Sequence, residues 1–410
     1  MTVSGIRLRY ALDVTSLRTI EEAQALVLAR AEPLDAEQVP VASAVGRVSA
    51  RAAAAVVDLP PFASSAMDGF AIRAGDAPGR LSVVDRAAAG SPAGLALGAG
   101  EAIEISTGGV VPDGADAVIP LEYVVQHDNT IEIAEGIAPG AHVRPRGGDI
   151  AAGDVVVPAG VRLGPAHLGA LAAAGIAEVT CARRPRVALL ATGSELVTVG
   201  TPLGPGQIYE SNGLMLAAAL AAIGADIELL PTAADDEPAH REAISRGLGA
   251  DVLVTSGGVS VGPHDLVRRI EAELGVEEVF WRVAIKPGKP ISFGVRGATL
   301  VFGLPGNPVS SLVGCELFVK PALRALQGID DPLPHIERGV LAAALRRNDA
   351  RDEFVRARSR VDRDGVVLEP LSGQESHMIA RAAAADALVH VPRGDGVLDA
   401  GSTVGWIRLD

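Results

Sequence analysis

Between Val187 and Leu326, short apolar runs alternate with segments of helical periodicity. The apolar runs of strand length are Val187–Leu190, Ala225–Leu230, Asp251–Val254, Glu278–Trp281 and Thr299–Phe302. The helix-like segments are Asn212–Ile223, Pro238–Leu248, Asp265–Leu274 and Pro308–Leu326. This alternation is typical of a doubly wound domain, in which helices cover both faces of a mostly parallel sheet.

The loops that follow these strands are rich in acids, hydroxyl groups, glycines and lysines. They are Thr192-Gly-Ser-Glu195, Asp235-Asp236, Ser256–Asp265, Lys286-Pro-Gly-Lys289 and Leu304-Pro-Gly-Asn-Pro308. Ligands of such sheets bind beyond the carboxyl ends of the strands. Any one loop could be an ordinary connection, but five together at one edge predict a ligand site.

A glycine turn in the loop after Val254 indicates what the ligand carries. Gly257, Gly258 and Gly262 let backbone approach a ligand without a Cβ in the way. The following helix begins there, and the start of a helix favours negative charge. We therefore expect a phosphate or another oxyanion at this turn.

Three carboxylates on the same edge extend this prediction. Magnesium is typically held by one or two carboxylates together with substrate phosphates, so Glu195, Asp235 and Asp265 suit cleavage of a phosphoanhydride. The alternative for Asp265 is a structural one, since it could cap the helix that it begins.

Other nucleotide and hydrolase motifs are absent from these loops. Thr192-Gly-Ser194 lacks the closing glycine of a nucleophile elbow, which disfavours a serine hydrolase. The turn Gly257–Gly262 is not followed by the Lys-Ser/Thr of a Walker A loop, and it lacks the glycine order of a dinucleotide site.

Lysine usage singles out one turn. The chain has only three lysines among its 36 basic residues, and Lys286 and Lys289 share a single Lys-Pro-Gly-Lys turn. An ammonium is a compact point charge whereas guanidinium is a planar fork, so retaining lysine here suggests a site for the smaller cation. Two solvated loop lysines are the alternative.

Composition limits the class of protein. At 410 residues the chain should hold two to four domains, given about 100 to 200 residues per domain. Its 50 acids outnumber 36 bases, so with a net charge of −14 nucleic acid is an unlikely partner. Cys181 and Cys315 lie far apart without metal-ligand spacing, which favours a reducing compartment. With no recognisable signal peptide and no apolar run of membrane-spanning length, we expect a cytoplasmic protein.

The rest of the chain contains further elements. Thr19 and Glu22 form a capping-box pattern at the start of an N-terminal helix. From about 40 to 145, short strand-like pieces broken by Gly and Pro predict a β module, and from about Asp330 similar pieces predict a small barrel or sandwich. The loop Gly373–His377 carries no chemistry that its spacing reveals.

Seven motifs, in order along nearly the whole chain, resemble those of one family. They are Ser65-Ala-Met-Asp-Gly-Phe-Ala71, Thr107-Gly, Arg144 through Asp149-Ile150, Thr192-Gly-Ser-Glu195, Ser256–Gly262 with Asp265, Lys286-Pro-Gly-Lys-Pro290 and Leu304-Pro-Gly-Asn-Pro-Val-Ser310. This set closely resembles the MoeA family of molybdopterin molybdenumtransferases, which includes the E domain of gephyrin.

The resemblance implies a multidomain α/β plus β subunit. Its parts would be a discontinuous helical linker domain (1–40 and 143–180), an inserted β-rich domain (41–142), a doubly wound MogA-like domain (181–328) and a C-terminal β barrel (329–410). It also implies a homodimer whose active site is shared between the doubly wound domain of one subunit and the inserted domain of the other.

The reaction implied by the resemblance takes adenylyl-molybdopterin and molybdate, cleaves the phosphoanhydride with Mg²⁺, releases AMP and inserts molybdenum at the dithiolene. The sequence leaves molybdate or tungstate open, because both are tetrahedral dianions. The molybdopterin adenylyltransferase and proteins that deliver the cofactor to molybdoenzymes are the implied protein partners.

Site residues also carry over from the resemblance. The implied metal and phosphate residues are Glu195, Asp235 and Asp265, with Lys286 and Lys289 neutralising oxyanions. The partner subunit would contribute Asp68, Thr107, Arg144 and Asp149. The remaining implied substrate-binding residues are Thr192, Ser256, Gly257, Gly258, Ser260, Pro305, Gly306, Asn307 and Pro308.

Four departures from the family pattern stand out. Ser194 and Gly148 occupy positions where the family usually has acids, which weakens any inference about metal count. His377 replaces a common Ser and Asp386 a frequent Asn, which puts the C-terminal domain's share in the site in doubt.

Two competing functions remain open. The molybdopterin adenylyltransferase of the preceding step has a similar doubly wound domain with a glycine turn, but would need neither an inserted β domain nor the Lys-Pro-Gly-Lys turn. A non-catalytic scaffold like gephyrin at receptors would call for appended or disordered segments, and the retained acids and lysines favour catalysis.

Overall fold

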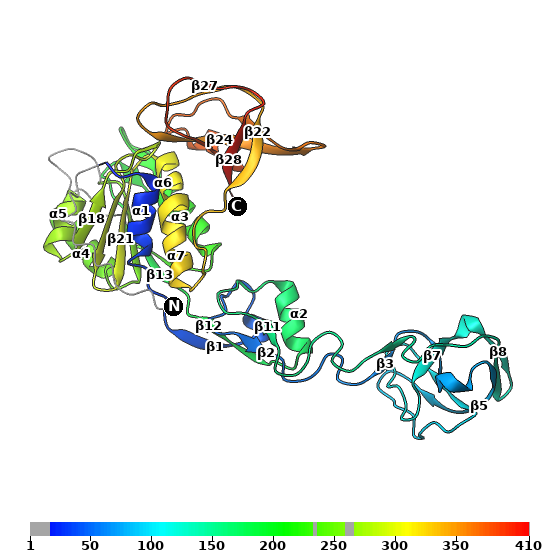
Figure 1. The fold of residues 1–410 in the computed structure, drawn as a ribbon. Helices are drawn as coiled ribbons and strands as arrows, with labels where there is room; N and C mark the ends of the chain where they lie inside the picture. Colours follow the sequence, from blue (N-terminus) through cyan, green and yellow to red (C-terminus); the bar gives the residue numbers. More distant parts are fainter. Residues whose placement is uncertain (1–16, 233–235, 259–265, 410) are drawn as a thin grey trace, which may run out of the picture. The chain divides into compact units, whose positions relative to one another are not determined.

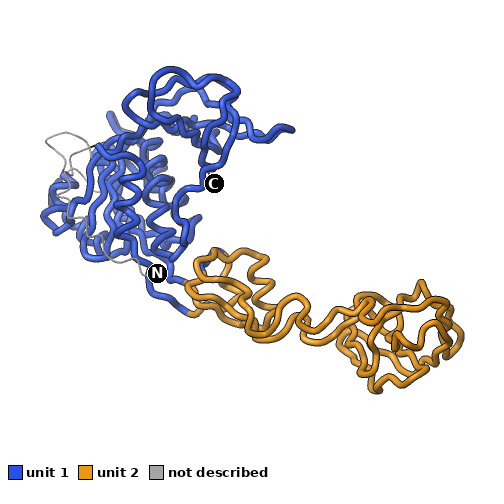
Figure 2. Tube along the Cα trace, in the orientation of Figure 1, with its two compact units in different colours: residues 1–37, 46–48, 182–410 blue, residues 38–45, 49–181 orange. Residues whose placement is uncertain are grey.

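The structure is a computed structural model that describes residues 17–232, 236–258 and 266–409. The chain divides into two compact units, coloured separately in Figure 2. The first unit comprises residues 1–37, 46–48 and 182–410, and the second comprises residues 38–45 and 49–181. Within the described ranges, none of the helices combines the length and apolar composition needed to cross a bilayer.

The described part of the first unit contains a six-stranded sheet with the strand order β16-β13-β17-β21-β20-β18. Its strands are β13 (Arg186–Ala191), β16 (Asp226–Leu229), β17 (Val252–Ser256), β18 (Glu277–Trp281), β20 (Ser292–Arg296) and β21 (Thr299–Leu304). The first four strands in this order are parallel, whereas β20 runs antiparallel to both of its neighbours. The five predicted strands are all present, and β20 is an additional one.

Helices cover both faces of this sheet, as predicted (Figure 1). The helices are α1 (Ile20–Leu28), α3 (Asn212–Ala221), α4 (Glu237–Gly247), α5 (Leu266–Glu273), α6 (Pro308–Gly314) and α7 (Lys320–Leu326), with a π-helical turn η4 (Cys315–Val319) joining the last two. One apolar core packs α1, α3, α6 and α7 on one face. A second, smaller core packs α4 and α5 on the other.

The first helix begins where the sequence predicted. The Thr19 hydroxyl accepts a hydrogen bond from the Glu22 amide at 3.2 Å, and the Glu22 carboxylate accepts one from the Thr19 amide at 3.0 Å. This reciprocal pair satisfies two amides that would otherwise lack partners, which confirms the capping box. The helix then buries Ile20, Ala23 and Val27 in the larger core.

The C-terminal region of the first unit is a closed barrel. Five long strands pair in the order β24-β25-β22-β28-β26, and β26 returns to β24. The elements are β22 (Glu337–Leu341), β23 (Leu345–Arg346), β24 (Asp352–Asp362), β25 (Gly365–Pro370), α8 (Ile379–Ala382), β26 (Ala387–Val391), β27 (Val397–Leu398) and β28 (Thr403–Arg408). The barrel surrounds the fully buried Trp406. Of the two predictions, barrel or sandwich, the barrel is confirmed.

Three further short strand segments belong to the described part of the first unit. They are β14 (Leu196–Val197), β15 (Ile208–Tyr209) and β19 (Ile285–Lys286). The first two pair in parallel with each other. The third pairs in parallel with β24 of the barrel, placing Lys286 opposite Glu353. The lysine turn is therefore joined to the C-terminal barrel.

The second unit contains a β-rich domain, as predicted. Its main sheet has six strands in the order β7-β4-β6-β5-β9-β8. They are β4 (Gly69–Ile72), β5 (Gly79–Ala87), β6 (Glu101–Ile105), β7 (Ala117–Pro120), β8 (Val124–His127) and β9 (Thr130–Ile133). Shorter elements are β3 (Ser64–Ser65), η2 (Ala74–Asp76), η3 (Leu121–Tyr123) and β10 (Val143–Arg144).

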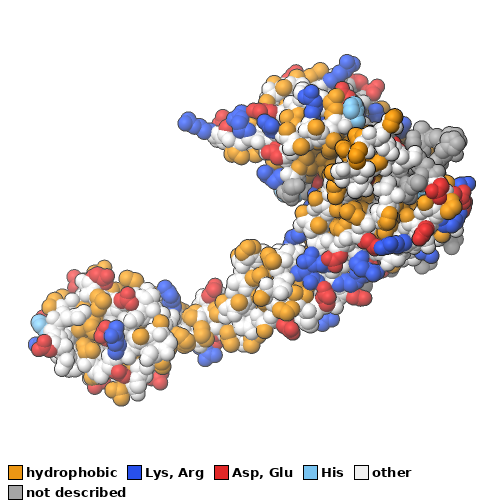
Figure 3. Space-filling view, turned by 180° about the vertical axis from the view of Figure 1, so that it is seen from behind, with side chains coloured by type: hydrophobic (Ala, Val, Ile, Leu, Met, Phe, Trp, Pro, Cys, Tyr) orange, Lys and Arg blue, Asp and Glu red, His pale blue; other side chains and the backbone are white. Residues whose placement is uncertain are grey.

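A smaller group of helices and strands is formed by the segments that precede and follow this β-rich domain in the sequence. Its elements are β1 (Ala36–Pro40), η1 (Val41–Ser43), β2 (Ala53–Ala54), β11 (Val155–Val157), α2 (Pro165–Ala173) and β12 (Glu178–Ala182). β1 pairs with β12, and β2 pairs with β11. The helix α2 buries Leu171 against Val157 and Leu163 in a separate apolar core. On the face shown in Figure 3, acidic and basic side chains are interspersed over both units.

Candidate active site

A pocket of about 730 Å³ lies in the first unit at the carboxyl edge of the parallel strands. Loops after β13, β17 and β21 each contribute to its wall. Nine predicted site residues line it, namely Thr192, Glu195, Ser256, Gly257, Gly258, Pro305, Gly306, Asn307 and Pro308. The structure therefore brings together three of the five loops, at the edge where the strand order predicts a ligand.

The glycine turn packs so closely that a side chain would not fit. Gly257 and Gly258 both have positive φ, at 98° and 66°. A Cβ on Gly257 would come within 2.7 Å of the Thr192 carbonyl oxygen and 2.8 Å of its hydroxyl. The Gly257 amide donates to the Leu304 carbonyl at 3.0 Å, and the Thr192 amide donates to the Ser256 carbonyl at 3.0 Å. These contacts fix the turn against both neighbouring strands.

Two carboxylates line the pocket. A Cβ on Gly193 would lie 2.6 Å from Oε2 of Glu195, so that carboxylate rests directly against the glycine. Glu195 is exposed, and the described residues contribute no hydrogen bond or ion pair to its carboxylate. Glu210 also lines the pocket, and its carboxylate accepts from the Gly213 amide at 2.8 Å.

The predicted metal set can be tested only in part. Asp235 and Asp265, together with Ser260, lie outside the described residues. Among the residues described, no group of three His, Cys, Asp or Glu side chains could hold a metal ion. Because magnesium often needs only one or two carboxylates beside substrate phosphates, the exposed Glu195 carboxylate fits the requirement for one ligand.

The two turn lysines lie beside the pocket rather than in its lining. Lys286 is 47% exposed and lies 3.0 Å from Oε1 of Glu353, a barrel residue. Lys289 is exposed as well, and its carbonyl accepts from the Val283 amide at 3.0 Å, which closes the turn. The neighbouring Pro290 lines the pocket. Because both lysines are exposed, their burial gives no support to the predicted oxyanion site over two solvated loop lysines.

The third lysine has a structural explanation. Lys320 is buried and forms an ion pair at 2.5 Å with Glu316, one helical turn earlier. Both side chains are about 5% exposed, so each charge depends on the other for compensation. This pair lies in the core of the helices α6 and α7, away from the pocket lining.

A loop of the C-terminal barrel completes the pocket wall through His377 and Ile379. The buried Arg356 on β24 holds this loop, because its guanidinium donates to the Met378 and Gly373 carbonyls at 2.7 Å each. The Val309 amide at the start of α6 donates to the Ser376 carbonyl at 3.1 Å. The barrel thus contributes to the pocket, a contribution that the sequence left in doubt.

Predicted residues of the second unit come together in one pair. The Asp68 carboxylate accepts from the Thr107 amide at 2.7 Å. Arg144 and Asp149 are exposed on the segment that follows β9, and Arg144 pairs with Ser64 through backbone. The Ala152 amide donates to the Asp58 carboxylate and the neighbouring Arg146 forms an ion pair with it, and these two contacts lower the pKa of Asp58.

Five polar residues of the pocket were missed by the sequence analysis: Tyr209, Glu210, Ser211, Asn212 and His240. Four of them form one run at the end of β15 and the start of α3. Polar residues at the start of a helix are usually caps, and no spacing rule distinguishes them from ligand contacts. Asn212 is the most buried of this run, at 9% exposure.

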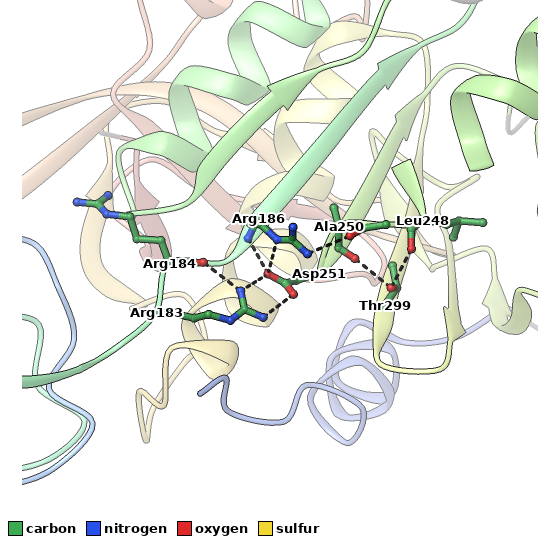
Figure 4. A network of polar contacts seen from close by, with 8 residues as sticks. Arg183, Arg184, Arg186, Leu248, Ala250, Asp251 and Thr299 are labelled. Carbon is green, nitrogen blue, oxygen red and sulfur yellow. Dashed lines mark hydrogen bonds and ion pairs between the residues drawn. The ribbon is translucent and has the colours of Figure 1, made fainter. Parts of the chain in front are cut away.

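The opposite edge of the same sheet has a different polar network, shown in Figure 4. The Arg183 guanidinium donates to both oxygens of Asp251, at 2.6 and 2.7 Å, and the Arg186 amide donates at 2.8 Å. Burial raises the pKa of Asp251, but these hydrogen bonds and the charges of both arginines outweigh it and lower that pKa. Asp251 therefore lies one strand length away from the pocket.

Three family models match the chain in succession. They are the MoeA N-terminal region (domains I and II) over residues 18–175, a probable molybdopterin binding domain over 188–325, and the MoeA C-terminal region (domain IV) over 338–409. The second match contains the glycine turn and the loops after β13 and β21. The third contains the barrel loop that completes the pocket.

Relatives and solved structures agree with these matches. Molybdopterin molybdenumtransferase 2 of Mycobacterium tuberculosis is 37% identical over 92% of this chain and 96% of its own length. The Staphylococcus aureus molybdopterin molybdenumtransferase is 31% identical, with 95% of each chain covered. A MoeA crystal structure from Pyrococcus horikoshii superposes with a TM-score of 0.84 at 28% identity, covering 96% of this chain and 100% of its own. The chain therefore belongs to the MoeA family of molybdopterin molybdenumtransferases.

Proposed function

We propose that this chain cleaves adenylyl-molybdopterin, transfers molybdenum from molybdate to the dithiolene and releases AMP, with Mg²⁺ as its metal ion. Its family makes it a molybdenum-transferring enzyme of molybdenum cofactor biosynthesis. The observation that carries the finer proposal is the pocket at the carboxyl edge, where the glycine turn and the Glu195 carboxylate lie in one wall.

The glycine turn supports binding of the phosphoanhydride. Gly257 and Gly258 each have a conformation that a residue with a Cβ adopts only with strain, and a Cβ would collide with Thr192 or Val267, so the backbone of the turn is held in one position. Fixed backbone donors stabilise negative charge without reorganising during the reaction. We assign the AMP phosphate to this turn, with Thr192, Ser256 and the loop Pro305–Pro308 surrounding it.

Acidic side chains on the same edge are assigned to the metal. We place Mg²⁺ on Glu195, with Asp235 and Asp265 as further ligands. When bound, the ion neutralises charge on the phosphate oxygens. Glu195 holds and orients the ion, and Asp265 is assigned the proton of the attacking group. Lys286 and Lys289 supply further positive charge for molybdate beside Pro290.

We further propose that the enzyme is a homodimer in which the partner subunit contributes Asp68, Thr107, Arg144 and Asp149. The hydrogen bond from the Thr107 amide to the Asp68 carboxylate supports a shared role for these two residues, because it holds them side by side. The division into parts at residues 1–40 with 143–180, 41–142, 181–328 and 329–410 belongs to the same proposal. The chain's two cysteines are both buried, which accords with a cytoplasmic enzyme.

The test is release of AMP from adenylyl-molybdopterin by the purified chain with Mg²⁺, with and without molybdate. We expect release that depends on molybdate. ATP-dependent adenylylation of molybdopterin instead would identify the preceding adenylyltransferase. No activity in either assay would favour a scaffold and contradict the proposal.

A further inference from the structure

Asn212, at the first position of α3, joins two separate loops of the pocket. Its Nδ2 donates to the Ser256 hydroxyl at 2.9 Å and to the Gly306 carbonyl at 2.7 Å. Ser256 opens the glycine turn after β17, and Gly306 lies in the loop after β21. These partners are 44 and 94 residues away in sequence, so one amide connects three segments that only the fold brings together.

The chemistry of the contacts fixes the orientation of the amide. If the two ends of the side chain were exchanged, its oxygen would face the Gly306 carbonyl oxygen at 2.7 Å, and two acceptors cannot form a hydrogen bond. The NH₂ group must therefore face Gly306 and Ser256. The side-chain oxygen, Oδ1, is directed to the other side.

That oxygen has no hydrogen-bond partner among the described residues, although it is fully buried. A buried acceptor without a partner lowers stability, so a residue chosen for stability alone would not retain it. An asparagine with an unpaired oxygen is expected where function requires the NH₂ group of the same side chain. Asn212 lies in the pocket wall, beside the two loops that its amide group holds.

Further hydrogen bonds connect the partners of Asn212 to the helix α6. The Ser256 hydroxyl lies 3.4 Å from the Ser311 hydroxyl on α6, and Ser311 in turn donates to the Pro305 carbonyl. The loop after β21 is thus held at Pro305 by a helix and at Gly306 by Asn212. Removal of the Asn212 amide would release Gly306 and the Ser256 hydroxyl together, while Ser311 still held Pro305.

We infer that Asn212 is a positioning residue of the active site, which sets the distance between the glycine turn and the Pro305–Pro308 loop so that both contact the AMP phosphate. This inference rests on the proposed function, in which these two loops surround that phosphate. Asn212 acts through Ser256 and Gly306 rather than through the reacting atoms.

The test compares AMP binding by Asn212→Asp, Asn212→Ala and the wild-type full chain, using titration calorimetry. Asn212→Asp keeps the shape of the side chain but removes both donated hydrogen bonds. We expect the Kd for AMP to rise at least tenfold in both variants. In the AMP-release assay, KM for adenylyl-molybdopterin should rise more than kcat falls.

Asn348→Ala is the matched control. The Asn348 side chain accepts hydrogen bonds from the Ala350 and Arg351 amides, at 3.1 and 2.9 Å, in a barrel turn outside the pocket lining. The same truncation there also removes two hydrogen bonds, and AMP affinity should stay within twofold of wild type. The Tm of Asn212→Ala should fall no further than that of Asn348→Ala.

Two results would overturn the inference. One is AMP affinity within twofold of wild type in both Asn212 variants. The other is loss of affinity that simply follows loss of folded protein, shown by recovery of binding at low temperature where the variants are fully folded. Absence of molybdate-dependent AMP release by the wild-type chain would instead contradict the proposed function, and the AMP affinities would still decide the role of Asn212.

Discussion

Polar residues at the two edges of the six-stranded sheet differ in whether the described residues satisfy their hydrogen bonds. At the amino edge of β13 and β17, the Asp251 carboxylate receives three hydrogen bonds from Arg183 and Arg186 (Figure 4). At the carboxyl edge, the described residues provide no partner for the Glu195 carboxylate or for the buried Oδ1 of Asn212. The strands between the edges are buried and apolar.

This difference separates stability from function within a single sheet. A polar group whose hydrogen bonds are satisfied inside the protein contributes to stability, and it has few donors or acceptors free to bind a ligand. A group left unsatisfied at the edge where ligands bind contributes little to folding and can serve a substrate. Substitutions at the two edges should therefore affect different measurements.

The largest expected effect is at the carboxyl edge. Glu195→Gln should lower molybdate-dependent AMP release by about 100-fold, because it removes the charge of the proposed metal ligand. Since this exposed carboxylate has no partner among the described residues, Tm should stay unchanged. Steady-state kinetics and a thermal melt on the same preparation check both parts. A large fall in Tm would show that Glu195 belongs with the stabilising edge.

At the amino edge, Asp251→Ala should lower the free energy of unfolding by about 2 kcal/mol, because it leaves Arg183 without its carboxylate. Urea denaturation at pH 7 measures this loss. Turnover of the folded fraction should equal that of wild type. Reduced turnover by fully folded Asp251→Ala protein would contradict the view that this edge affects stability alone.

The pH dependence of stability sharpens the same point. Since the folded-state pKa of Asp251 is lower than its ordinary value of 3.8, the pair stabilises the protein fully above about pH 5. That stability is lost as pH falls below 3.8 toward the folded-state pKa. The difference in unfolding free energy between wild type and Asp251→Ala should therefore shrink in acid. A difference that is constant down to pH 3 would contradict the ion pair.

A smaller effect is expected at the lysine turn. Lys289→Ala should raise KM for molybdate about tenfold, because it removes a cation that needs no displacement from a protein partner. Lys286→Ala is the comparison, since Lys286 already pairs with Glu353. We expect Lys286→Ala to change KM less. Equal KM values for wild type and Lys289→Ala would favour solvated loop lysines.

The smallest effect is expected from Thr299→Val at the amino edge. The Thr299 hydroxyl donates to the Leu248 and Ala250 carbonyls at 3.3 and 3.0 Å. Losing these bonds should lower the unfolding free energy by about 1 kcal/mol. AMP affinity, measured by calorimetry, should not change. A variant as stable as wild type would show that water replaces the hydroxyl.

Much of the doubly wound domain could be predicted from sequence because five of its described strands lie on apolar or mixed runs of strand length. The exception is β20, whose run Ser292–Arg296 is interrupted by Gly294. The structure requires a glycine there, because a Cβ would lie 2.8 Å from Val276 and 2.9 Å from the Glu277 carbonyl oxygen. Such close packing between strands depends on tertiary contacts that no local pattern reveals.

The loops of the pocket could be predicted because their position follows from strand direction. Asn212 could not, because its two partners lie on distant loops and its own position resembles a helix cap. Asp251 is the opposite case, because it lies close to the glycine turn in the sequence but far from it in the fold. Asp251 directly precedes the five-residue strand β17 and Ser256 ends it, which places the two residues at opposite edges of the sheet.

The barrel loop held by Arg356 has a consequence for how the enzyme is made. A ribosome synthesises the doubly wound domain first, but His377 and Ile379 join the pocket wall only when their loop is held in place. The barrel that holds it closes through β28, Thr403–Arg408, which pairs with both β22 and β26. A nascent chain therefore acquires a complete pocket wall only after that strand has been synthesised, and a product shortened before it would keep only the part of the pocket that the doubly wound domain supplies.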